Sequence, residues 1–177
     1  MRKFAKFVLL FALCLFALYL GAQAGKGGSG VNWTAPKRWT ADADRPMRLA
    51  TYKVPAAAGD SEAGECGVFF FGAGQGGDLQ ANLTRWTGQF QTPGGQPIAS
   101  PKTQKQTIAG FAVTTVDISG TYMQSSGPMM AAKSSKAGYR MLAAVVEGKQ
   151  ANVFFKLTGP AKTVAAAEAE FQGLLKS

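Results

Sequence analysis

Two apolar segments joined by a short turn constrain the fold of this chain more than any other feature. Tyr139–Glu147 and Asn152–Leu157 are both typical of strands, and the turn Gly148-Lys149-Gln150 separates them. A connection this short joins neighbouring antiparallel strands, because parallel strands need a crossover of a dozen or more residues. A second pair with an equally short connection, Gln104–Ile108 and Phe111–Tyr122, lies upstream. The chain is therefore expected to form a mainly antiparallel sheet.

Three further strands are indicated upstream of these pairs. Val31–Trp39 contains two tryptophans and predicts an edge strand with a turn. Met47–Val54 predicts another strand, and the continuous apolar run of Glu65–Phe71 is typical of a strand at the centre of a sheet. Met123–Gly138 is small and polar, which predicts a long mobile loop.

Two amphipathic helices are also predicted. Asp78 can cap the first, which we expect to extend to about Phe90, because a carboxylate at this position accepts a hydrogen bond from a first-turn N–H. The second begins at Thr158-Gly159-Pro160, with proline at its first helical position. The core-facing residues are expected to be Leu79, Leu83, Trp86 and Phe90 in the first helix and Val164, Ala167, Phe171, Leu174 and Leu175 in the second. The order of these elements predicts an α+β fold in which two helices pack on the sheet.

Residues 1–24 are expected to be an export signal rather than part of the fold. Basic residues precede the apolar run Phe7–Leu20, which is short for a membrane span, and Ala22-Gln23-Ala24 has the pattern of a signal-peptidase site. We predict cleavage after Ala24 and a secreted or periplasmic protein with no stable membrane insertion; an uncleaved membrane anchor is the alternative. Residues 25–30 are then a flexible leader, and residues 31–177 a single domain.

The composition excludes several kinds of chemistry. The chain contains no histidine, which removes Ser-His-Asp triads, Cys-His pairs and imidazole metal ligands. Cys66 is the one cysteine left after the predicted cleavage, and its apolar neighbours predict a buried thiol, with a reactive or dimer-forming thiol as the alternative. We expect no metal and no cofactor. The net charge of +9 comes from scattered basic residues, so nucleic-acid binding is not expected.

The most distinctive local motif is Gly72-Ala-Gly-Gln-Gly-Gly77, which matches G-x-G-x-x-G between an expected strand and an expected helix. Backbone N–H groups of such a loop can bind an anion at a helix N-terminus. The acidic residue of a dinucleotide site and the lysine of a phosphate-binding loop are missing, and Asp78 would repel phosphate. The motif is either a turn that needs positive φ angles or a contact for a ligand or partner. The candidate binding residues are Gly74, Gln75, Gly76, Gly77, Asp78 and Arg85.

Two short motifs resemble a known fold group. Pro36-Lys-Arg-Trp39 precedes a strand, and Phe154-Phe-Lys-Leu-Thr-Gly-Pro160 precedes the last helix. This arrangement resembles the Mog1/PsbP-like fold and, among bacterial exported proteins, the DcrB-type group. Phe69–Gln89 and Tyr139–Pro160 are also similar to stretches of uncharacterised bacterial secreted proteins. Because the fold group includes a photosystem accessory subunit and a Ran-binding protein, the resemblance implies partner binding more than catalysis.

We therefore expect an exported, non-enzymatic domain that binds a protein or envelope partner, through the Gly72–Asp78 loop and Met123–Gly138. One alternative is a small-ligand or anion-binding module that uses the Gly72–Asp78 loop. Another is a hydrolase that uses carboxylates such as Asp78 and Asp117, which would have to converge in one pocket. The sequence leaves the partner and the oligomeric state open.

Overall fold

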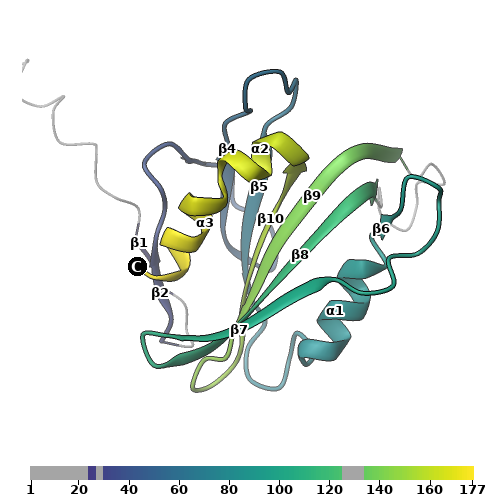
Figure 1. Cartoon of the computed structure of the whole chain (residues 1–177). Coiled ribbons are helices and arrows are strands. Elements are labelled where there is room, and N and C mark those ends of the chain that lie inside the picture. Colours follow the sequence, from purple (N-terminus) through teal and green to yellow (C-terminus); the bar gives the residue numbers. More distant parts are fainter. Residues whose placement is uncertain (1–23, 27–29, 125–133) are drawn as a thin grey trace, which may run out of the picture.

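An eight-stranded sheet forms the body of the molecule (Figure 1). The computed structural model describes residues 24–26, 30–124 and 134–177. The strands are β1 (Ala24–Lys26), β2 (Asn32–Thr34), β3 (Thr40–Ala41), β4 (Arg48–Val54), β5 (Gly64–Phe70), β6 (Phe90–Gln91), β7 (Lys102–Ile108), β8 (Phe111–Gln124), β9 (Ser134–Val146) and β10 (Val153–Pro160). The helices are α1 (Leu79–Thr87), α2 (Ala161–Ala166) and α3 (Glu168–Leu175).

The large sheet has the strand order β3-β4-β5-β10-β9-β8, and both β6 and β7 pair with β8. β1 and β2 form a separate pair. Every pairing among the described strands is antiparallel. The predicted α+β fold with a mainly antiparallel sheet is therefore confirmed.

The predicted hairpin is formed by β9 and β10, whose pairing runs from Val146 opposite Val153 to Tyr139 opposite Pro160. β10 also pairs with β5, so it lies inside the sheet. Successive side chains of a strand point to opposite faces. Phe155 consequently belongs to the core on one face, whereas Phe154 belongs to the core on the other.

The two C-terminal helices cover one face of the sheet (Figure 1). Their predicted apolar stripe is confirmed, because all of its residues are buried: Val164, Ala167, Phe171, Leu174 and Leu175. The predicted single helix is interrupted at Ala167, where α2 ends and α3 begins. Pro160 is the last residue of β10 and the N-cap of α2, rather than its first helical residue. On this face the rings of Trp33 and Phe155 pack edge to face, with centroids 5.6 Å apart.

Helix α1 lies on the opposite face of the sheet (Figure 1). Its N-terminus is as predicted, since the carboxylate of Asp78 accepts a hydrogen bond of 2.7 Å from the N–H of Ala81. Trp86 is 3% exposed and packs in the cluster between α1 and the sheet. Leu79 and Leu83 are half-buried and pack against the same cluster, so the predicted core face of α1 is confirmed.

The predicted extension of this helix to Phe90 is wrong. α1 ends at Thr87, and Phe90 lies in β6 opposite Tyr122 of β8. The carbonyl of Gln89 accepts a hydrogen bond of 2.8 Å from the N–H of Met123, so the chain joins the sheet instead of continuing the helix. Because α1 is only nine residues long, it covers part of its face of the sheet and leaves the rest open.

The predicted loop Met123–Gly138 is also wrong at both ends. β8 continues to Gln124 and β9 begins at Ser134, with Gln124 opposite Ser134 and Tyr122 opposite Lys136. Small polar residues extend these strands because the paired backbone supplies the hydrogen bonds. The centre of the predicted loop, residues 125–133, lies outside the described residues.

Most of the predicted export signal, residues 1–23, lies outside the described residues as well. The predicted flexible leader, residues 25–30, is partly wrong, because Gly25 pairs with Trp33 and Lys26 pairs with Asn32 in the β1–β2 ladder. Within the part of the chain that the structure describes, no helix is long and apolar enough to span a membrane.

Cys66 is fully buried in β5, as predicted. Burial raises the pKa of its thiol well above the ordinary value. Because the thiolate is the reactive form of cysteine, this thiol is unreactive in the folded protein.

Candidate functional site

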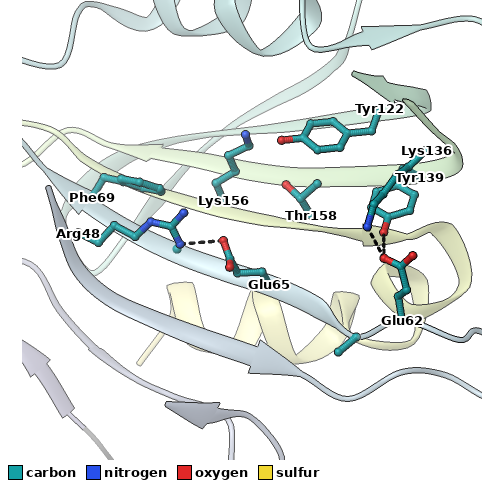
Figure 2. A pocket seen from close by; sticks show the side chains of 11 residues that line it. Arg48, Glu62, Glu65, Phe69, Tyr122, Lys136, Tyr139, Lys156 and Thr158 are labelled. Atoms are coloured by element: carbon teal, nitrogen blue, oxygen red, sulfur yellow. Dashed lines mark hydrogen bonds and ion pairs between the residues drawn. The ribbon is translucent and has the colours of Figure 1, made fainter. Parts of the chain in front are cut away.

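A polar cavity of about 260 Å³ lies on the face of the sheet that α1 leaves partly open. We call it the polar cavity; Figure 2 shows the side chains that line it. Five strands supply most of them: Arg48 of β4, Glu65, Gly67 and Phe69 of β5, Tyr122 of β8, Lys136 and Tyr139 of β9, and Lys156 and Thr158 of β10. Glu62 and Ala63 come from the loop before β5. Alternation along the strands explains this set, since Glu65, Gly67 and Phe69 share one face of β5, and Lys156 and Thr158 share that face of β10.

Lys156 is the central cation of the polar cavity. Its Nζ donates a hydrogen bond of 2.6 Å to Oε1 of Gln89 and lies 5.8 Å from the ring centroid of Tyr122. Burial of the ammonium, with smaller contributions from the charges of Arg48 and Arg85, lowers the pKa of Lys156 to about 8. Within the described residues, Lys156 forms no ion pair with a carboxylate.

Both carboxylates that line the cavity form ion pairs with neighbouring cations. Nη1 of Arg48 lies 2.7 Å from Oε1 of Glu65, and Nη1 of Arg45 lies 2.9 Å from Oε2 of the same group (Figure 2 shows the first pair). Glu62 accepts hydrogen bonds from Lys136 and from the phenol of Tyr139, the latter at 2.6 Å. The hydrogen bond from Lys136, followed by that from Tyr139, lowers the pKa of Glu62.

Arg48 is held on the wall of the cavity by contacts on two sides. Its guanidinium lies 5.1 Å from the ring centroid of Phe69, a cation–π distance, in addition to its ion pair with Glu65. Gly67 makes this packing possible, because a Cβ there would lie 2.8 Å from the Phe69 ring and 3.3 Å from Nη1 of Arg48. The missing side chain of Gly67 thus leaves room for both groups.

Thr158 carries the one buried side-chain polar atom without a hydrogen-bond partner among the described residues. Its Oγ1 lines the polar cavity two residues along β10 from Lys156. A buried hydroxyl without a partner costs about 1–3 kcal/mol, so such groups usually bind water or a ligand. Lys156 and Thr158 together present an ammonium group and a hydroxyl group to whatever enters the cavity.

The predicted glycine loop lies between β5 and α1, away from the polar cavity. Gly76 has a φ of 84°, and a Cβ there would lie 2.7 Å from the ring of Phe71 and 2.8 Å from that of Phe154. The carbonyls of Gly76 and Asp78 accept hydrogen bonds of 2.9 and 2.8 Å from the side-chain amide of buried Asn82. These contacts fit the interpretation of the motif as a tight turn between β5 and α1.

The other predicted site residues are distributed around this turn. Gly74 and Gln75 are exposed in the loop, Gly77 has a φ of 75°, and Asp78 caps α1. Arg85 is exposed on α1 and donates a hydrogen bond to Oδ1 of Asn82. None of these six residues lines the polar cavity as the structure describes it.

Asp78 and Asp117 do not converge. Asp117 accepts two hydrogen bonds of 2.9 Å from Arg140, which also binds Glu168 of α3 at 2.8 Å. Asp117 therefore lies on the face that α2 and α3 cover, whereas Asp78 caps α1 on the opposite face. A carboxylate pair made of these two residues is excluded.

The residues of the polar cavity were missed because they come from strands far apart in the sequence. A signal was present in Phe155-Lys156-Leu157, where a cation interrupts an apolar strand, and in Glu65 beside buried Cys66. Alternation places such charges on the less covered face of the sheet. Only the register of β4, β5 and β10 shows that they meet.

Comparisons with known proteins bear on the fold. No protein-family model and no curated protein matches this sequence. Among solved structures, PA94, a protein of unknown function from Pseudomonas aeruginosa, aligns over 88% of this chain and 94% of its own, with 13% identity and a TM-score of 0.50. PsbP (CyanoP) from Synechocystis sp. PCC 6803 aligns over 88% of this chain and 89% of its own, with 11% identity and a TM-score of 0.52. The chain has a PsbP-like fold.

Proposed function

We propose that this protein is an exported, non-catalytic binding domain whose polar cavity receives an acidic group of a protein or envelope partner. The observation that carries the proposal is the ammonium group of Lys156. It is half-buried, hydrogen-bonded to the neutral amide of Gln89 and, within the described residues, paired with no carboxylate; it lies beside Arg48 and the unpartnered hydroxyl of Thr158. A carboxylate would supply the charge and the acceptor that these groups lack.

The paired carboxylates support this assignment. Glu65 is shared between Arg45 and Arg48, and Glu62 between Lys136 and Tyr139. Neither is available to Lys156 without breaking an existing pair. The cavity therefore keeps an uncompensated positive charge, which favours a negatively charged ligand.

The role in export and the relation to the DcrB-type group are parts of the same proposal. They are supported by the apolar run Phe7–Leu20, the pattern Ala22-Gln23-Ala24 and the motif Phe154–Pro160. Partner binding rather than catalysis is supported by the geometry, because the two carboxylates of the polar cavity are both neutralised by neighbouring cations.

The test is a titration of the purified protein with N-acetylglycine, followed by the NMR signals of Lys156 and Thr158. We expect both amide signals to shift and to saturate in the millimolar range, which is the affinity of a single exposed carboxylate contact. N-acetylglycinamide, which lacks the charge, should leave them unchanged. Unchanged signals with the acid would contradict the proposal.

Two variants sharpen this test. Lys156→Met should abolish the shifts, whereas Lys149→Met, which removes the same charge from the exposed turn between β9 and β10, should not. Because the pKa of Lys156 is about 8, binding should weaken as the pH rises through this value. Equal binding above and below that pH would show that the ammonium does not hold the ligand.

A further inference from the structure

A second cavity adjoins the polar cavity on the same face of the sheet. Its volume is about 200 Å³, and we call it the aromatic cavity because the rings of Phe69, Phe71, Trp86 and Phe154 line it, together with Arg85, Gln89 and Lys156. Phe69 and Lys156 line both cavities. An apolar compartment and a cationic compartment thus share a wall.

The aromatic cavity has room for one apolar group. An engineered apolar cavity of about 150 Å³ binds benzene, so a cavity of about 200 Å³ can hold a phenyl ring or a branched aliphatic side chain. Trp86 and Phe154 are buried, whereas Phe69 and Phe71 are half-buried. The ring centroids of Phe71 and Phe154 are 5.9 Å apart, and those of Phe69 and Phe71 are 6.2 Å apart. The compartment is therefore aromatic in character and open on one side.

We propose that the two cavities together bind the C-terminal residue of a polypeptide partner, with its carboxylate at Lys156 and an apolar side chain in the aromatic cavity. This inference rests on the proposed function and names the ligand of the same site.

The shared wall is the reason for choosing a chain terminus. Since Lys156 borders both compartments, the charge and the apolar group of the ligand must lie within a few bonds of each other. In a C-terminal residue, the carboxylate and the side chain leave the same carbon atom. An internal Asp or Glu has no apolar group attached so close to its carboxylate. Because both cavities are open to solvent, the rest of the partner chain can leave the site.

The charges around the junction favour the same ligand. Arg85 lines the aromatic cavity, and its charge, like that of Arg48, acts on Lys156. A carboxylate at Lys156 would thus lie in the field of three cations, while Glu65, the carboxylate whose charge acts on Lys156, is held by Arg45 and Arg48. The amide of Gln89, which now binds Lys156, can bind the backbone of the partner.

The test compares four ligands by calorimetry and NMR with the purified protein. N-acetyl-Gly-Phe carries both groups, its C-terminal amide lacks the charge, N-acetyl-Gly-Gly lacks the apolar side chain, and 3-phenylpropionate lacks the peptide. We expect N-acetyl-Gly-Phe to bind at least tenfold more tightly than N-acetyl-Gly-Gly, because burial of a phenyl ring adds more than one factor of ten in affinity. It should also bind more tightly than its amide, which lacks the charge for Lys156, and than 3-phenylpropionate, which lacks the peptide group for Gln89. Intermolecular NOEs should connect its ring to Trp86 and Phe154.

Each departure from this result has a defined meaning. Equal binding of N-acetyl-Gly-Gly and N-acetyl-Gly-Phe would overturn the role of the aromatic cavity and leave the carboxylate site of the proposed function intact. Equal or tighter binding of 3-phenylpropionate would overturn the choice of a chain terminus. No binding of any of the acids would contradict both proposals.

Variants provide an independent check. Lys156→Met should reduce the affinity for N-acetyl-Gly-Phe at least tenfold and reduce the preference for the acid over its amide, whereas Lys149→Met should change neither. Arg85→Gln, at an exposed position, should reduce the affinity for the acid by a few-fold and leave the amide unaffected. Unchanged discrimination between acid and amide in Lys156→Met would overturn the proposal.

Discussion

The two faces of the sheet differ in how much of their surface the helices cover. On one face, α2 and α3 cover a continuous apolar cluster that includes Trp33, Phe155 and Phe171. On the other face, α1 covers the aromatic cluster around Trp86, and the sheet beyond it carries Arg48, Glu65 and Lys156 around a cavity. The comparison teaches that two helices bury a larger apolar cluster than one, and that the polar and aromatic cavities lie on the face that the single helix α1 covers in part.

The largest expected effect is on the face that α2 and α3 cover. Phe171→Ala removes a ring that is 0% exposed under α3 and should lower the free energy of unfolding by about 4 kcal/mol. Urea denaturation measures this loss. Leu49→Ala, at a position that is 39% exposed, is the control and should change the free energy by less than about 0.5 kcal/mol. A loss near the control value would mean that α3 contributes little to the core.

A somewhat smaller effect is expected on the open face. Trp86→Ala should lower the free energy of unfolding by about 3 kcal/mol, because the indole is 3% exposed and belongs to the smaller cluster under the single helix α1. Thr84→Ala, at an exposed position of the same helix, controls for changes in helix propensity. If Trp86→Ala cost more than Phe171→Ala, the contrast between the two faces would be wrong.

The third prediction concerns the charge on the open face. Burial lowers the pKa of Lys156 to about 8 from its ordinary value of 10.5. Between these two pH values the unfolded chain binds a proton that the folded chain has lost, so folding stability rises with pH in this window. Lys156→Met should remove that rise, which we expect to be roughly 1–3 kcal/mol, and should stabilise the protein at neutral pH.

Urea denaturation of both proteins across this pH window measures the difference. Lys149→Met, at an exposed turn, should follow the wild-type protein. Parallel pH profiles for the wild type and Lys156→Met would show that Lys156 is more hydrated than its position in the cavity indicates.

The smallest effect is expected at the rim of the covered face. Glu170 of α3 binds Arg38 through two hydrogen bonds of 2.8 Å and accepts a third from Trp39 at 3.0 Å. Because the pair is exposed, Glu170→Gln should cost no more than about 1 kcal/mol at neutral pH.

The contribution of the Arg38–Glu170 pair to stability should depend on pH. The hydrogen bond from Arg38 lowers the pKa of Glu170, so the contribution is present above the ordinary carboxyl pKa and is lost as the pH falls through the lowered value. Thermal or urea unfolding of the wild type and Glu170→Gln should therefore converge in acid. A difference that persists there would assign the effect to packing rather than to charge.

Much of the fold could be predicted from local pattern. The hairpin of β9 and β10, the cap at Asp78 and the buried stripe of the C-terminal helices all follow from short-range periodicity and turn residues. The ends of elements are harder to predict. The end of α1, for example, depends on the backbone hydrogen bond between Gln89 and Met123, which connects segments that are far apart in the sequence. Local sequence carries no record of that contact.

The candidate site could not be predicted in the same way. The glycine motif is recognisable because its residues are adjacent in the sequence. In the structure, however, Gly76 lies so close to the rings of Phe71 and Phe154 that a side chain would not fit. Arg48 and Lys156 are about a hundred residues apart and meet only through β5. Arg85 is the single predicted site residue that lines either cavity among the described residues, because α1 happens to lie over their junction.

The buried thiol of Cys66 can serve as a reporter of local opening in the core. Cys66 lies opposite Tyr52 of β4 and Leu157 of β10, the two strands that hold the walls of the polar cavity. Because the thiol is fully buried in the core under α2 and α3 and its pKa is raised by burial, a thiol-reactive dye can label it only after that core has opened. The labelling rate would thus measure how often the core opens, and slower labelling in the presence of a ligand would report binding without any engineered probe.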